Sequence, residues 1–107
     1  MGPVGPDGAP LPMPSPDTSP LLTELLGQVV VIDLRSSYVC LGTLTKIESD
    51  YLELQDADLH DFRDSPATRE VYVYDSVRLG IRRNRARVLL RRDEVVALTR
   101  FADVSVS

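Results

Sequence analysis

Apolar and β-branched runs recur from residue 28 onward and predict a mainly β chain. The first run, Val29 to Leu34, is followed by a Ser36-Ser37 break, after which the strand pattern resumes from Tyr38 to Ile47. A polar break at residues 48–50 then precedes a further apolar run at residues 51–54. These segments predict two successive hairpins.

Two more strands are predicted near the C-terminus, at residues 86–91 and 94–101. The charged corner between them, Arg91-Arg92-Asp93-Glu94, predicts a tight hairpin that carries two arginines and two carboxylates at its tip. Gly42 lies inside a predicted strand, where a missing side chain suits a sharp bend or a close backbone approach, although an ordinary strand also tolerates glycine.

Capping residues predict two helices. Ser19 and Pro20 precede four leucines and Gly27, which predicts a helix of about two turns that must pack on the sheet because it is too short to stand alone. A second helix is predicted at residues 66–79, between a serine cap and Gly80, although residues 71–74 have strand propensity that competes with it. A helix, five short strands and a bent glycine strand predict a small SH3-like barrel with a helical insertion between strands 3 and 4.

Composition favours one small domain. The chain has 107 residues, of which 43% are hydrophobic. Residues 1–18 hold six of the eight prolines and are predicted to be a disordered tail, with a docking peptide for other proteins as the alternative. We expect the domain to span residues 19–104, with the insertion at about 58–84. No stretch has the pattern of a signal peptide or a membrane span, so a cytoplasmic location is expected.

Charge is divided along the chain, although the net charge is only −4. Residues 48–64 hold seven carboxylates and one arginine, whereas residues 78–92 hold seven arginines and no acidic residue. The negative total disfavours indiscriminate nucleic-acid binding, which needs clustered cations. A divided surface suits an anionic ligand on one face, or identical subunits that meet positive to negative.

Two patterns resemble the motifs of the Sm/LSm family in a divergent, bacterial-type form. Gly42-Thr43-Leu44 followed by the acidic turn at residues 48–50 is similar to the first motif. The run Val-Leu-Leu-Arg-Arg-Asp-Glu-Val-Val at residues 88–96 is similar to the second, where family members usually have Arg-Gly-Asp or Arg-Gly-Asn. The resemblance covers roughly residues 19–104. It implies an Sm-like bent five-stranded barrel that binds single-stranded RNA and self-associates into a ring, strand 4 pairing with strand 5 of a neighbour.

The resemblance also implies an RNA site at the two motif loops. In the first loop, Glu48 best matches the family's acidic residue, Asp50 is the alternative if the loop is shorter, and Tyr51 takes the stacking role. In the second loop, Arg91 matches the motif arginine and Asp93 the acidic position.

The loops also depart from the family pattern. The family's base-reading asparagine is replaced by Tyr51 or Leu52, and its glycine by Arg92. These departures argue against a base-specific uridine pocket, whereas contacts from Arg91 and Arg92 to phosphates or stacked bases remain feasible, so Arg92 is a candidate site residue as well.

The charge pattern also fits functions other than RNA binding. The arginine run could be a solvated strand face with some ion pairs to residues 48–64, and the chain could be an oligomeric scaffold without nucleic-acid binding. No nucleophile, acid–base pair or phosphate loop is laid out, so we expect neither an enzyme nor a cofactor. His60 lies among three aspartates, a pattern commoner in solvated acidic loops than in metal sites. The single cysteine, Cys40, is predicted to be buried.

Overall fold

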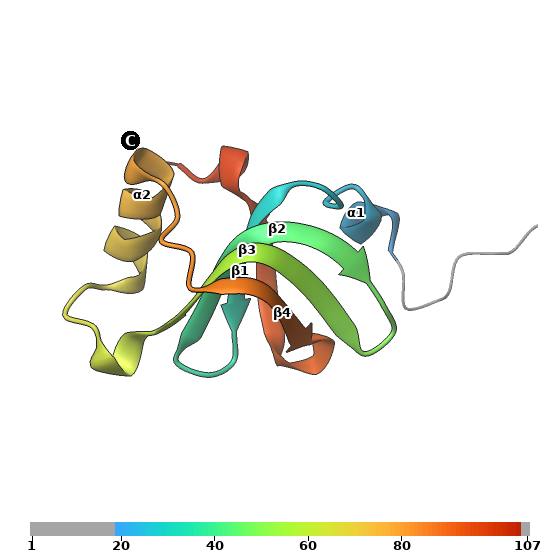
Figure 1. The fold of residues 1–107 in the computed structure, drawn as a ribbon, viewed down its shortest axis with the longest axis horizontal. Coiled ribbons are helices and arrows are strands. Elements are labelled where there is room, and N and C mark those ends of the chain that lie inside the picture. The colour runs from blue at the N-terminus through green and yellow to red at the C-terminus, as the bar shows by residue number, and fades with distance from the viewer. Residues whose placement is uncertain (1–18, 106–107) are drawn as a thin grey trace, which may run out of the picture.

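The computed structural model describes residues 19–105, which form one antiparallel sheet of five strands with short helices around it (Figure 1). The strand order is β4-β3-β2-β1-β5. The strands are β1 Val29–Leu34, β2 Tyr38–Ile47, β3 Tyr51–Asp61, β4 Arg85–Arg91 and β5 Val95–Arg100. The helices are α1 Pro20–Thr23 and α2 Arg69–Leu79, with 3-10 turns η1 Phe62–Asp64, η2 Arg92–Glu94 and η3 Phe101–Asp103. The predicted mainly β fold, with one helix before the strands and one between β3 and β4, is confirmed.

The predicted hairpin of the last two strands is wrong. β4 pairs with β3 and β5 pairs with β1, so the two strands that η2 joins lie at opposite ends of the strand order. A hairpin of β4 and β5 could add to only one edge of the β1–β3 sheet, whereas separating the two strands gives both β3 and β1 an outer partner. The Arg35 N–H donates to the Glu94 carbonyl at 2.8 Å, which ties η2 to the β1–β2 turn.

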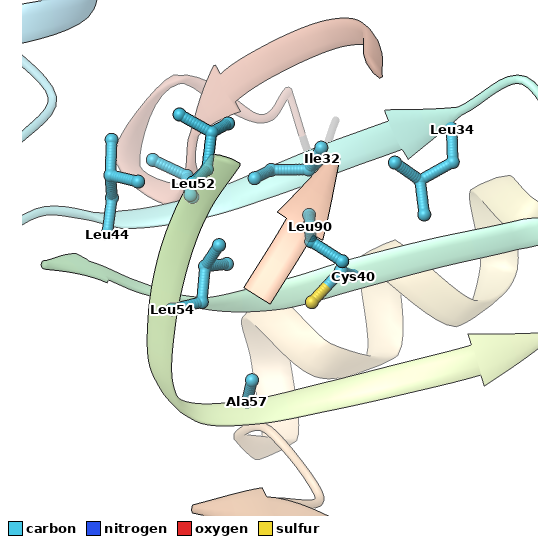
Figure 2. Close-up of a cluster of buried hydrophobic side chains, with 9 residues drawn as sticks. Ile32, Leu34, Cys40, Leu44, Leu52, Leu54, Ala57 and Leu90 are labelled. Carbon is cyan, nitrogen blue, oxygen red and sulfur yellow. The ribbon is translucent and has the colours of Figure 1, made fainter. Parts of the chain in front are cut away.

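The sheet bends where Gly42 of β2 faces β3. The register shifts there, since Leu41 pairs with Asp58 and Thr43 pairs with Gln55. Asp56, within the shift, has a left-handed φ of 51°. Figure 2 shows the ribbon turning sharply between Leu54 and Ala57. Of the two roles that the sequence left open for Gly42, the structure shows the bend, which follows from a bulge in β3.

The main core lies inside this bend, where the side chains labelled in Figure 2 gather. Leu22 and Leu25, from α1 and the turn after it, pack against this core, whereas Leu21 is 75% exposed. Cys40 is fully buried, as predicted. The buried members are Val30, Ile32, Leu34, Cys40, Leu44, Leu52, Leu54, Ala57 and Leu90.

A second cluster lies on the other face of β1 and β2. Its buried members Val31, Val39 and Leu41 are covered by side chains from η1, α2 and the C-terminal segment. Burial on both faces explains the continuous apolar run of β1, which does not alternate. The covering residues are Phe62, Tyr72, Val73, Ile81, Phe101 and Val104.

The segment between β3 and β4 differs in its boundaries from the prediction. β3 continues as far as Asp61, although the strand signal fades after Ala57. Helix α2 begins at Arg69 rather than at residue 66, because the Thr68 hydroxyl caps it by accepting a hydrogen bond from the Val71 N–H at 3.2 Å. Its end before Gly80, where φ is 98°, is as predicted.

Candidate nucleic-acid interface

The two motif loops meet at one end of the β3–β4 pair. The Glu48 N–H donates to the Tyr51 carbonyl at 2.9 Å and closes the β2–β3 turn. Tyr51 then lies opposite Arg91 in the β3–β4 register. The Arg92 N–H donates to the Asp50 carbonyl at 2.9 Å, so the main chains of the turn and η2 are hydrogen-bonded to each other.

A cleft of about 380 Å³ lies between the two loops. Five of the six predicted site residues line it together with Ser49: Asp50, Tyr51, Arg91, Arg92 and Asp93. Glu48 instead lines a smaller hollow of about 180 Å³, whose wall also includes Tyr51. The structure thus brings the predicted residues together, with Tyr51 between the two hollows.

Arg92 holds the loops together. Its Nη1 donates to the Glu48 carbonyl at 2.6 Å, and its own N–H reaches Asp50. The bulky residue that replaces the expected motif glycine therefore bonds to the main chain of the facing turn. A charge-assisted hydrogen bond of this kind is stronger than a neutral one.

Arg91 and Tyr51 offer the accessible groups of the cleft. The Arg91 Nη2 atom lies 2.7 Å from Asp93 Oδ2, with the two side chains 65% and 63% exposed. An ion pair so exposed contributes little to stability, so a phosphate could replace the carboxylate at small cost. The Tyr51 residue is 42% exposed, which suits a ring that stacks on a base.

A buried carboxylate beside the cleft, Glu53, pairs with an arginine and was not singled out from the sequence. Glu53 is 4% exposed, and Arg87 Nε donates to its Oε1 at 2.6 Å across the β3–β4 pair. Lys46 Nζ lies 3.8 Å from Oε2. The hydrogen bond from Arg87 holds the pKa of Glu53 below its usual 4.5. The expectation that some arginines pair with carboxylates of residues 48–64 is confirmed by this pair. The alternation of side chains along a strand does not by itself show that Glu53 is buried.

His60 and its neighbour Asp61 contact other side chains of the chain. Within residues 19–105, no group of three or more His, Cys, Asp or Glu could hold a metal ion. Asp61 accepts hydrogen bonds from Arg63 and Ser37, and the His60 ring stacks on Tyr72 with a centroid distance of 4.2 Å. None of the helices in this part of the chain is both long and apolar enough to cross a membrane.

Comparison with protein-family models and with curated proteins gives no match for this sequence. Solved structures do match. An Sm protein from Pyrococcus abyssii in complex with a uridine heptamer aligns over 78% of this chain and 99% of its own, with a TM-score of 0.52 and 17% identity. An Sm-like protein from Archaeoglobus fulgidus aligns over 83% of this chain and 97% of its own, with a TM-score of 0.52 and 14% identity. The chain has the Sm fold. At these identities the likeness shows the fold alone.

Proposed function

We propose that this chain is an Sm-like, RNA-associated protein that assembles into a ring and binds single-stranded RNA at the cleft between the β2–β3 turn and η2. The observation that carries the proposal is the position of η2. It joins the two outer strands of the sheet, it contributes Arg92 and Asp93 to the cleft, and it directly follows Arg91, the last residue of β4, which also lines the cleft. The fold likeness to a protein solved with a uridine heptamer supports the same conclusion.

The outer strands supply the reason for assembly. β4 and β5 end the strand order, and within residues 19–105 each has a strand partner on one side only. Leu89 of β4 is 50% exposed and Val96 of β5 is 66% exposed. Pairing β4 of one copy with β5 of the next would bond both edges and cover these side chains. Because η2 connects the edges, closure would place the clefts of all copies around one axis.

The cleft supplies the reason for RNA rather than another anion. Arg91 offers a planar guanidinium to phosphate, and the half-exposed Tyr51 offers a ring on which a base can stack. Neither contact reads a base edge, so we expect weak preference between sequences and strong dependence on salt.

Assembly is tested by sedimentation of the full chain and of Val96→Asp. A charge on the β5 edge should disfavour pairing, so wild type should sediment as an oligomer and the variant as a monomer. Val71→Asp is the matched control, since Val71 is 49% exposed on α2 and belongs to neither outer strand. A monomeric wild type at micromolar concentration would refute the ring.

RNA binding is tested by fluorescence polarisation with oligouridylate and oligoadenylate at two salt concentrations. Arg91→Ala and Tyr51→Ala should each weaken binding at least about fivefold, as expected for loss of a phosphate contact or a stacked base. Arg78→Ala, on α2, removes an arginine outside the cleft and should leave binding unchanged. An oligomer that binds neither RNA at low salt would support the scaffold function instead.

A further inference from the structure

A second cavity lies at the other end of the β3–β4 pair from the cleft. The register runs from Tyr51 opposite Arg91 at the cleft to Ala57 opposite Arg85, a separation of roughly 20 Å along the strand. Beyond this point, between β3, α2 and the segment that leads into β4, is a cavity of about 510 Å³. Nothing in the proposed RNA function uses it.

A buried carboxylate lies in the cavity wall. Asp58 is 4% exposed, and its Oδ1 accepts a hydrogen bond from Asn84 Nδ2 at 2.8 Å. Within residues 19–105, no cation lies within ion-pair distance of Asp58. Burial raises the pKa of Asp58, because desolvation disfavours its charge. A buried acceptor of this kind favours a further N–H donor.

Asn84 fixes this wall in place. Its Oδ1 accepts from the Leu59 N–H at 3.0 Å, its Nδ2 donates to the Leu59 carbonyl at 3.1 Å, and its own N–H donates to the Ala57 carbonyl at 2.9 Å. The side-chain amide of Asn84 is thus hydrogen-bonded through both its oxygen and its nitrogen to β3. The two arginines before it are held next to the buried carboxylate by this anchor.

Two other residues of the wall carry unsatisfied polar atoms. His60 Nε2 and Tyr72 Oη are buried and have no hydrogen-bond partner within the described residues. Their rings stack nearly parallel, at 14°. Buried polar groups are seldom left unpaired, so the pair points to a partner that the described residues do not provide.

The exposed side of the cavity is cationic. Arg82 and Arg83 line it, both are exposed, and neither forms an ion pair among residues 19–105. Guanidinium groups match the geometry of phosphate oxygens. The ligand should therefore be anionic at one end and present uncharged N–H donors at the other.

We propose that this cavity binds a single nucleotide, with its phosphate on Arg82 and Arg83 and the N–H edge of its base on Asp58, beside His60 and Tyr72. The volume lies in the range of small-molecule sites. A neutral base edge suits the buried carboxylate better than an ammonium group would, since burial disfavours charge there. Guanine presents two adjacent N–H donors and is the most suitable probe.

The test is calorimetric titration of the full chain with guanosine monophosphate, guanosine and inorganic phosphate. Recognition at both ends predicts that the nucleotide binds at least tenfold more tightly than either fragment. Arg82→Ala with Arg83→Ala should reduce nucleotide affinity to that of guanosine, whereas Arg78→Ala, outside the cavity, should not change it. Absence of nucleotide binding, or affinity no higher than that of phosphate, would overturn the proposal.

Tyr72→Phe separates ligand binding from folding. Because no residue that the structure describes bonds to the Tyr72 hydroxyl, its removal should leave the melting temperature unchanged or raise it while lowering nucleotide affinity about threefold or more. A lower melting temperature with unchanged affinity would assign the hydroxyl to the fold and contradict the site.

An RNA tetranucleotide with a 5′-phosphorylated guanosine distinguishes the source of the ligand. If it displaces the nucleotide, an RNA end occupies the site, and if it does not, a free nucleotide does.

Discussion

Gly42 and Ala57 face each other so closely that a Cβ atom on Gly42 would lie 2.9 Å from the Ala57 Cβ atom. It would also lie 3.0 Å from the Ala57 Cα and 3.1 Å from the Gln55 carbonyl oxygen. Two of these three neighbours are main-chain atoms, which cannot rotate away. The sheet can bend here because residue 42 has no side chain.

Gly42→Ala should therefore lower the free energy of unfolding by about 1–3 kcal/mol, the usual cost of overpacking. Urea denaturation followed by circular dichroism measures it. Adding Ala57→Gly should recover only part of the loss, because the main-chain contacts remain. Unchanged stability of the single variant would mean that the strands do not approach as described.

The ion pair between the buried Glu53 and the exposed Arg87 predicts an asymmetry between single and double variants. Arg87→Ala leaves a buried carboxylate with Lys46 at 3.8 Å and Gln55 Nε2 at 3.5 Å, so it should destabilise the fold. Arg87→Ala combined with Glu53→Gln should be less destabilised, because no unpaired charge is buried. Arg85→Ala, an exposed position on the same strand, is the control, and equal losses in all three variants would contradict the prediction.

Asp61 predicts how stability depends on pH. Hydrogen bonds from the Arg63 side chain, the Ser37 hydroxyl and the Arg63 N–H hold the pKa of Asp61 well below its usual 3.8. Because the pKa is lower in the folded chain, this stabilisation is present above pH 3.8 and is lost as the pH falls below it. In urea denaturation measured from pH 7 to pH 2, Asp61→Asn should reduce the loss of unfolding free energy at acid pH, here called the acid limb. Ser37→Ala should reduce it partly, and an unchanged limb in Asp61→Asn would refute the assignment.

The complete burial of Cys40, the only cysteine of the chain, predicts that its thiol reacts slowly. Burial raises the pKa of Cys40 to about 12, and the residue has no exposed surface. The thiolate is the reactive form, so a chromogenic disulfide reagent at pH 8 should label the folded chain only as fast as it unfolds. The same chain in urea should label within the mixing time of a manual assay. Rapid labelling without urea would show that the core opens readily.

Local chemistry explains which features could be predicted before the structure. Ser19 and Gly80 mark the beginning and end of helical segments through groups within one turn of themselves, so their roles are visible in the sequence. The sequence predicts too early a start for α2, because Ser65 and Thr68 can both cap a turn, and both do so here. In the sequence, Asp58 and Glu53 look like any other acidic residue of a strand. Their burial and their hydrogen bonds to Asn84 and Arg87, which are distant in the sequence, exist only in the folded chain.

By itself, the sequence determined the five strands, the approximate limits of all of them except β3, and the residues of the candidate RNA site, because each depends on side-chain pattern or on a motif. Only the tertiary structure decided which strands pair. Main-chain N–H and C=O groups are much the same along the chain, so no local sequence feature specifies that β4 pairs with β3 and β5 pairs with β1. That choice follows from the curvature of the whole sheet, and the same curvature brings Tyr51 next to Arg91 and opens the cavity beneath α2.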